Sequence, residues 1–174
     1  MLQHLARDEE LEPPITACWL AYPGTLDVRN IPEKYQSEYT SLEQAAEGPG
    51  LNEKGVDFLY SKISTLSFLV FTATDLFNEE AVQPDPNSEL WTPLTWSSGH
   101  AGLPRTYIQV CGRDPFRDDG LLYERELRQE GVETKLDIYA GCPHGVNILF
   151  AQTSAAKRFE VERLDGFRWL LRKE

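Results

Sequence analysis

Short apolar runs separated by amphipathic stretches predict an α/β protein with about three strands. Residues 15–22 are almost continuously apolar and end at Pro23-Gly24, which is typical of a strand buried on both faces. Residues 106–111 predict a second strand that ends at Gly112, and residues 135–139 predict a third. The chain therefore carries enough strand for a short sheet only.

Helical patterns flank these strands. Residues 118–130 predict a helix with Asp118 or Asp119 near its cap and Gly131 just after its end. Residues 2–10 have helical spacing up to Pro13-Pro14, and Ser154 opens a last helix with an apolar face. Strands joined by long crossovers pair in parallel, so we expect a parallel sheet with flanking helices.

Residues 25–104 separate the first two strands and are too many for an ordinary connection. Helical stretches are predicted near residues 32–47 and 53–66, before the Pro-rich residues 83–87. We therefore expect a helical insertion, or lid, within a single domain of residues 1–174. Its aromatic side chains are candidates to line a ligand cavity, but packing of the insertion onto the body is the more common use of such residues.

Composition narrows the classes of function. The formal net charge is −11, and such a chain lacks the clustered cations that nucleic acids and anionic membranes require. The charged start has no apolar signal segment, and Cys18, Cys111 and Cys142 lack disulfide or zinc spacing. We expect a cytoplasmic protein with reduced thiols, no metal and no organic cofactor.

Two titratable residues follow neighbouring predicted strands. Asp114 comes directly after the second strand, and His144 comes after the third. Chemistry in parallel sheets gathers at the carboxyl ends of strands, and a carboxylate there can orient an imidazole as a general base. The order of Asp before His also matches the last two members of the α/β-hydrolase triad.

The motifs around these residues resemble the hormone-sensitive-lipase-like α/β-hydrolases. Residues 112–120 are similar to that family's D-P-L-R-D-E-G motif, and residues 139–145 to its Y-x-G-x-P-H-G motif. Residues 20–24 are similar to the strand that follows the family's nucleophile helix. The resemblance implies that Asp114 is the triad acid, His144 is its base, and residues 25–104 are the lid. The candidates for binding a small hydrophobic substrate are Phe71, Trp91, Trp96, Cys142 and Val146.

The sequence departs from this family in one important respect. It contains no G-x-S-x-G nucleophile elbow and no H-G-G-G oxyanion loop, so it resembles the second half of a truncated α/β-hydrolase fold. A thiol nucleophile at Cys142 is an alternative, although a cysteine at a strand end is more often a small buried apolar residue. Ser97 and Ser98 with His100 are a weaker alternative, because they lie in a polar loop.

Three functions remain open. In the first, the chain is a hydrolase-like enzyme for a small hydrophobic ester or lactone, whose nucleophile comes from outside the chain. In the second, it is a serine-independent lyase, dehydratase, isomerase or cyclase that uses His144 as general acid–base. In the third, it is a non-enzymatic binding or assembly partner. The first strand should also have a bare apolar edge, which predicts a homodimer, a higher oligomer or a separate amino-terminal chain that covers it.

Overall fold

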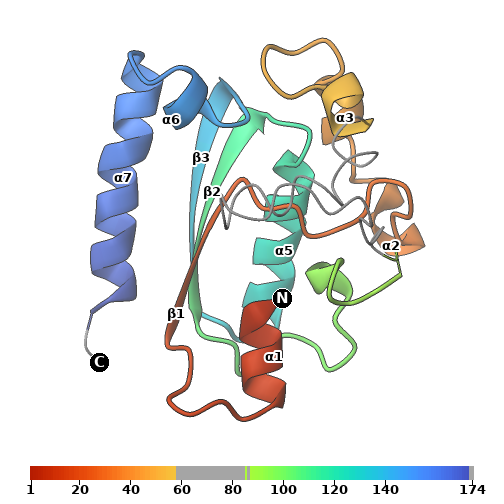
Figure 1. Ribbon diagram of the computed structural model, residues 1–174, viewed down its shortest axis with the longest axis vertical. Coiled ribbons are helices and arrows are strands. Elements are labelled where there is room, and N and C mark those ends of the chain that lie inside the picture. The colour runs from red at the N-terminus through yellow and green to blue at the C-terminus, as the bar shows by residue number, and fades with distance from the viewer. Residues whose placement is uncertain (58–84, 86, 173–174) are drawn as a thin grey trace, which may run out of the picture.

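The computed structural model describes residues 1–57, 85 and 87–172. They form three layers, with a small sheet between two layers of helices. The sheet contains β1 (Ala17–Ala21), β2 (Arg105–Arg113) and β3 (Thr134–Pro143), in that order and all parallel. The helix α5 (Arg117–Gln129) lies on one face and α7 (Ser154–Leu170) on the other (Figure 1). The expected parallel three-stranded sheet of a truncated α/β-hydrolase fold is confirmed.

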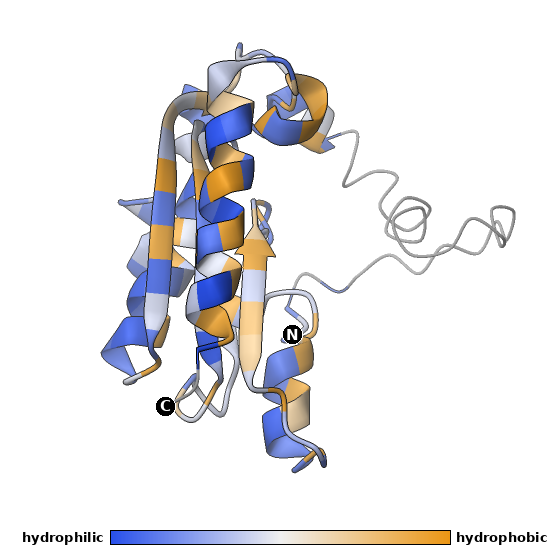
Figure 2. Ribbon diagram, turned by 90° about the vertical axis from the view of Figure 1, so that its left-hand side faces the viewer, coloured by the Kyte–Doolittle hydropathy of each residue, from blue (hydrophilic) through white to orange (hydrophobic). Residues whose placement is uncertain are grey.

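The central strand β2 supplies both halves of the core because its side chains alternate between the two faces. Ile108 and Val110 pack with α5 and the start of the insertion in one apolar cluster, whereas Cys111 packs with α7 in a second. Figure 2 shows β1 coloured as apolar along most of its length, whereas α7 alternates between apolar and polar positions. The α5 side of the sheet buries the larger apolar cluster, and the α7 side also buries Gln109, which donates to Tyr139 and to the Phe159 carbonyl.

Several element boundaries differ from the predicted ones. The first strand is shorter than residues 15–22 because Tyr22 has a positive φ of 53°, which ends the extended conformation. The other two strands are longer than predicted. Asp118 and Asp119 lie inside α5 and do not cap it, since no side chain caps this helix. The last helix begins at Ser154 as expected, with the Thr153 hydroxyl accepting from the Ala156 N–H.

The insertion is less helical than predicted over residues 32–47. It forms two four-residue pieces, α2 (Glu33–Gln36) and α3 (Ser41–Gln44), followed later by the short η1 (Pro93–Thr95). Residues 53–57 are helical, and the rest of the predicted stretch 53–66 lies outside the described residues, as does Phe71. The amino-terminal helix α1 (Leu2–Asp8) lies at the end of the sheet opposite α6 (Val146–Leu149) (Figure 1).

Candidate active site

The ends of two paired strands bring Asp114 and His144 together. Arg113 of β2 is in register with Pro143 of β3, so the next residue of each strand emerges at the same edge of the sheet. The Nδ1 atom of His144 lies 2.9 Å from the Oδ2 atom of Asp114. The predicted proximity of these two residues is therefore present in the structure.

The Asp114 carboxylate is held on both of its oxygens. Its Oδ1 accepts the backbone N–H of Phe116 at 2.8 Å, which leaves Oδ2 for His144. Its side chain is 1% exposed, whereas the His144 side chain is 29% exposed. A carboxylate bonded at Nδ1 favours the tautomer with hydrogen on Nδ1 and a free lone pair on Nε2. No described residue bonds to that Nε2, so this nitrogen is available for proton transfer.

Two aromatic rings flank the imidazole, and the sequence analysis missed both. The ring centroid of Tyr22 lies 5.0 Å from that of His144, and the centroid of Phe116 lies 5.8 Å from it. The Tyr22 hydroxyl donates to Asn147 Oδ1 at 2.7 Å, which ties the end of β1 to the turn after His144. Tyr22 directly follows β1 and Phe116 lies three residues after the end of β2, and this closeness to the carboxyl ends of strands is the signal that could have identified them.

The insertion also reaches this site. A Cβ atom added to Gly50 would lie 3.7 Å from the His144 carbonyl oxygen and 3.6 Å from Leu149. Gly50 has a φ of 85°, a conformation that side chains rarely adopt, and it lets the chain pass close to the turn that carries His144. A residue distant in sequence thus lies beside the turn that carries His144.

The predicted substrate-binding residues are dispersed. Val146 is buried, and Cys142 packs beside it in the apolar cluster below the His144 turn. The Trp91 indole donates to Asp27 within the insertion. Trp96 stacks on His4 and donates to Asp8 of α1, at the other end of the sheet from His144. The structure thus gathers Cys142 and Val146 near His144, but it places Trp96 in the packing of α1.

The alternative nucleophiles have other environments. Burial raises the pKa of the Cys142 thiol, which keeps the thiol protonated and poorly nucleophilic at neutral pH. Ser98 donates to Asp8, and His100 pairs with His4, so this serine and histidine serve the contact with α1. Among the described residues, no three His, Cys, Asp or Glu side chains gather to hold a metal ion.

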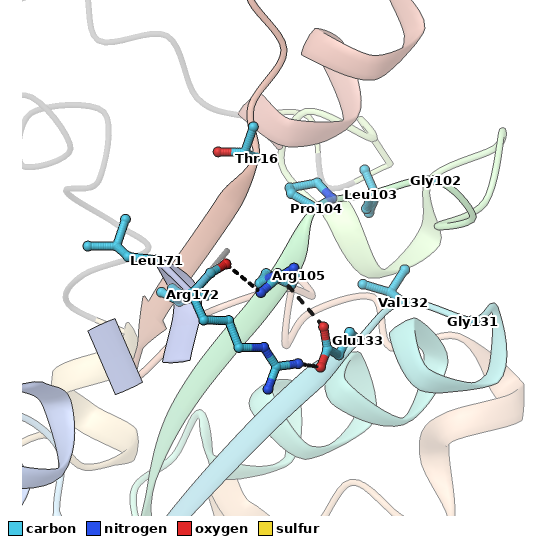
Figure 3. A pocket seen from close by; sticks show the side chains of 11 residues that line it. Thr16, Gly102, Leu103, Pro104, Arg105, Gly131, Val132, Glu133, Leu171 and Arg172 are labelled. Atoms are coloured by element: carbon cyan, nitrogen blue, oxygen red, sulfur yellow. Dashed lines mark hydrogen bonds and ion pairs between the residues drawn. The ribbon is translucent and has the colours of Figure 1, made fainter. Parts of the chain in front are cut away.

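A pocket of about 540 Å³ lies at the amino ends of β2 and β3, away from His144 (Figure 3). Its charged side chains pair with one another, because Glu133 contacts both Arg105 and Arg172. Catalytic groups of parallel sheets lie at the opposite, carboxyl ends of the strands.

None of the described helices is long and apolar enough to span a membrane.

A family model described as the alpha/beta hydrolase fold matches residues 1–148, and the chain belongs to this family. An α/β-hydrolase superfamily protein of Schizosaccharomyces pombe is 32% identical over 171 residues, which cover 98% of this chain and 45% of that protein. The versiconal hemiacetal acetate esterase of Dothistroma septosporum is 28% identical, with 96% of this chain and 45% of the esterase covered.

Solved structures give the same picture. A crystal structure of vibralactone cyclase matches with a TM-score of 0.78 and 32% identity over 97% of this chain and 44% of the cyclase. A bacterial heroin esterase matches with a TM-score of 0.69 and 25% identity, over 98% of this chain and 47% of the esterase. The chain thus spans less than half the length of these relatives.

Proposed function

We propose that this chain supplies the acid–base half of an ester-hydrolysing site for a small hydrophobic ester or lactone. The observation that carries the proposal is the 2.9 Å contact between the His144 Nδ1 and the buried Asp114 carboxylate. In this proposal His144 takes the proton of a nucleophile at Nε2 and returns it to the leaving group. Asp114 orients the ring and stabilises the imidazolium as it forms. The esterase relatives support this class of reaction.

The nucleophile and the oxyanion donors come, in this proposal, from a polypeptide that pairs with the free edge of β1. Among the described residues, β1 pairs with β2 alone. Nearby apolar side chains are open to solvent: Leu2 is 67% exposed, Leu11 is 51% exposed and Ile15 is 38% exposed. An unpaired apolar edge is a template for another strand. A separate amino-terminal chain would cover this edge and supply these groups, whereas a second copy of this chain would cover the edge but carries neither the G-x-S-x-G elbow nor the H-G-G-G loop.

The test begins with the protein purified from its own source, whose native mass is measured before any activity. A larger polypeptide or a stoichiometric partner is expected, and a fluorophosphonate should label a serine outside residues 1–174. Hydrolysis of a short-chain p-nitrophenyl ester by that assembly should fall by about 10²–10⁴-fold in His144→Ala and in Asp114→Asn. Asp165→Asn, an exposed carboxylate on α7, is the matched control and should retain activity.

A second function is favoured by the similarity to vibralactone cyclase. In this second proposed function, His144 of this chain acts as a general acid–base for a lyase, dehydratase, isomerase or cyclase step that needs no serine. This function predicts a native mass of the chain alone or of its homo-oligomer, no fluorophosphonate labelling, and turnover that is lost in His144→Ala. A non-enzymatic binding or assembly role predicts instead that replacing Asp114 and His144 together changes no activity of the native assembly.

A further inference from the structure

Asp119 binds the beginning of the insertion although it lies in the first turn of α5. Its Oδ1 accepts the backbone N–H of Thr25 at 2.7 Å and that of Leu26 at 2.8 Å. Its Oδ2 accepts the hydroxyl of Tyr39. The Asp119 residue is 0% exposed, so these contacts are shielded from water. Bonds to a buried carboxylate are stronger than ordinary neutral hydrogen bonds.

Asp118 binds the next part of the insertion in the same manner. Its Oδ2 accepts the backbone N–H groups of Thr40 at 2.7 Å and Ser41 at 2.8 Å, where α3 begins. Arg117 donates to the other oxygen, Oδ1. The Ser41 hydroxyl donates in turn to the carbonyl of Pro115 at 2.7 Å. Two consecutive carboxylates thus satisfy four backbone N–H groups of the insertion.

These attachments lie next to the Asp114–His144 pair. In the sequence, Asp114 lies a few residues before Asp118 and Asp119. The helix α3 lies above the beginning of α5 in the view of Figure 1. From α3 the chain runs on to Gly50, where an added Cβ atom would lie 3.7 Å from both the Pro143 side chain and the His144 carbonyl oxygen. Residues 25–50 therefore span from the Asp114 loop to the His144 turn.

We propose that Asp118 and Asp119 are positioning residues that fix residues 25–50 as one wall of the substrate site beside His144. This inference rests on the proposed function for the meaning of the site, but the attachment itself is independent of any reaction. The two acids touch no reacting atom. They act by setting the distance between the insertion and the imidazole, and therefore the shape of the substrate that fits.

The contacts of Asp119 are compatible with either protonation state. Burial raises its pKa to about 7, against the opposing effect of its three donors. When the group is protonated, Oδ1 still accepts from Thr25 and Leu26, and the Oδ2 hydroxyl donates to Tyr39. Asparagine has the same shape and the same pattern of one acceptor and one donor. Asp119→Asn should therefore preserve the attachment, and Asp119→Ala should abolish it.

The experiment compares amide hydrogen exchange and the His144 ring resonance in the intact chain and its variants. In Asp119→Ala we expect the Thr25 and Leu26 amides to exchange at least 10-fold faster, while the β2 amides stay protected. The His144 Cε1–H resonance should shift, because the wall beside it has moved. Asp119→Asn should restore both observations. The three histidines of the chain make this resonance simple to assign.

Glu124→Ala is the matched control, because Glu124 is also a buried carboxylate of α5 but bonds to Thr134 and Arg128, neither of which belongs to the insertion. It should leave the Thr25 amide and the His144 resonance unchanged. If Asp119→Ala fails to fold, Asp118→Ala is measured at the Thr40 and Ser41 amides.

Unchanged exchange in the alanine variants overturns the attachment. Faster exchange with an unmoved His144 resonance overturns the positioning role and leaves the attachment intact. Neither readout requires turnover, so failure of the proposed reaction is a separate result.

Discussion

The helix α1 packs against residues 96–100 through the pair His4 and His100, both of which are neutral. Acidification should therefore weaken this contact. The His4 side chain is fully buried, with its Nε2 3.0 Å from the Nδ1 of His100 and its ring stacked on Trp96 at 4.7 Å. Its Nδ1 has no hydrogen-bond partner among the described residues. A proton added to this pair would place a charge in a site that cannot solvate it.

The direction of the effect follows from the pKa values. Burial lowers the pKa of His4 from 6.5 to about 3, and burial also lowers the pKa of His100. The facing charged groups are Arg7, Asp8 and the amino terminus around His4, and Glu130 beside His100. A lowered pKa in the folded state means that the unfolded state binds the proton first. Stability is therefore complete above pH 6.5 and is lost as the pH falls below it.

The magnitude comes from the interval between the two pKa values. A pH of 5 is 1.5 units below the pKa of 6.5 that His4 has in the unfolded state, so unfolded His4 is protonated there. Folded His4, with a pKa of about 3, is still neutral at this pH. At about 1.4 kcal/mol per unit, His4 alone should remove about 2 kcal/mol of unfolding free energy between pH 7 and pH 5. This is a large share of the stability of a typical domain.

Urea unfolding at pH 7 and pH 5, followed by far-ultraviolet circular dichroism, measures this effect. His4→Gln removes the titrating ring and should cost about 1 kcal/mol or more at pH 7 through the lost contact with His100. The variant lacks the His4 titration, so its stability relative to the natural chain should rise by about 2 kcal/mol at pH 5, which offsets or reverses its deficit at pH 7. Gln3→Ala, which removes the neighbouring bond to Tyr123, is the control and should keep the natural pH dependence. Equal losses in His4→Gln and the natural chain would refute the reasoning.

Two further predictions concern α7. A Cβ atom at Gly166 would lie 1.9 Å from the Tyr107 ring, so Gly166→Ala should destabilise the fold by about 3 kcal/mol or more, measured by urea unfolding. Gly131→Ala meets no atom within 4 Å and has only its φ of 81° to strain it, so a loss of about 1–2 kcal/mol is expected; equal losses would contradict the packing argument. Thr153→Ala removes the bond to the Ala156 N–H and should lower the unfolding free energy by about 1 kcal/mol, which Thr153→Ser should largely recover.

The proximity of Asp114 and His144 could be predicted from sequence because the place of each residue depends on local information. Asp114 and His144 each follow an apolar run that ends in a turn, and parallel strands place such ends along one edge. The parallel pairing of the strands needed only the rule that long crossovers join parallel strands. Tyr22 lies in the same kind of position, but an aromatic residue after a strand carries no chemical signal of its own.

The attachment of the insertion could not be predicted, because the partners are far apart in sequence. Two acids at the beginning of a helix ordinarily indicate a cap, and the sequence pattern accordingly predicts that Asp118 or Asp119 lies near the cap of this helix. The donors that they bind lie 77 to 94 residues earlier in the chain. The stacking of Trp96 could not be predicted for the same reason, since the ring on which it stacks belongs to His4.

Residues 112–119, which run from the end of β2 to the first turn of α5, serve two purposes, and this has a consequence for substitutions within them. These residues include the acid that contacts His144 and the two acids that hold the insertion. Arg117 joins the two groups, because it donates to Asp118 and to the Gly112 carbonyl. A backbone shift in residues 112–119 would move the insertion and the imidazole together. A change confined to the side chain of Asp119 would move the insertion alone, so the acid–base contact and the shape of this site should respond separately to different substitutions within this one segment.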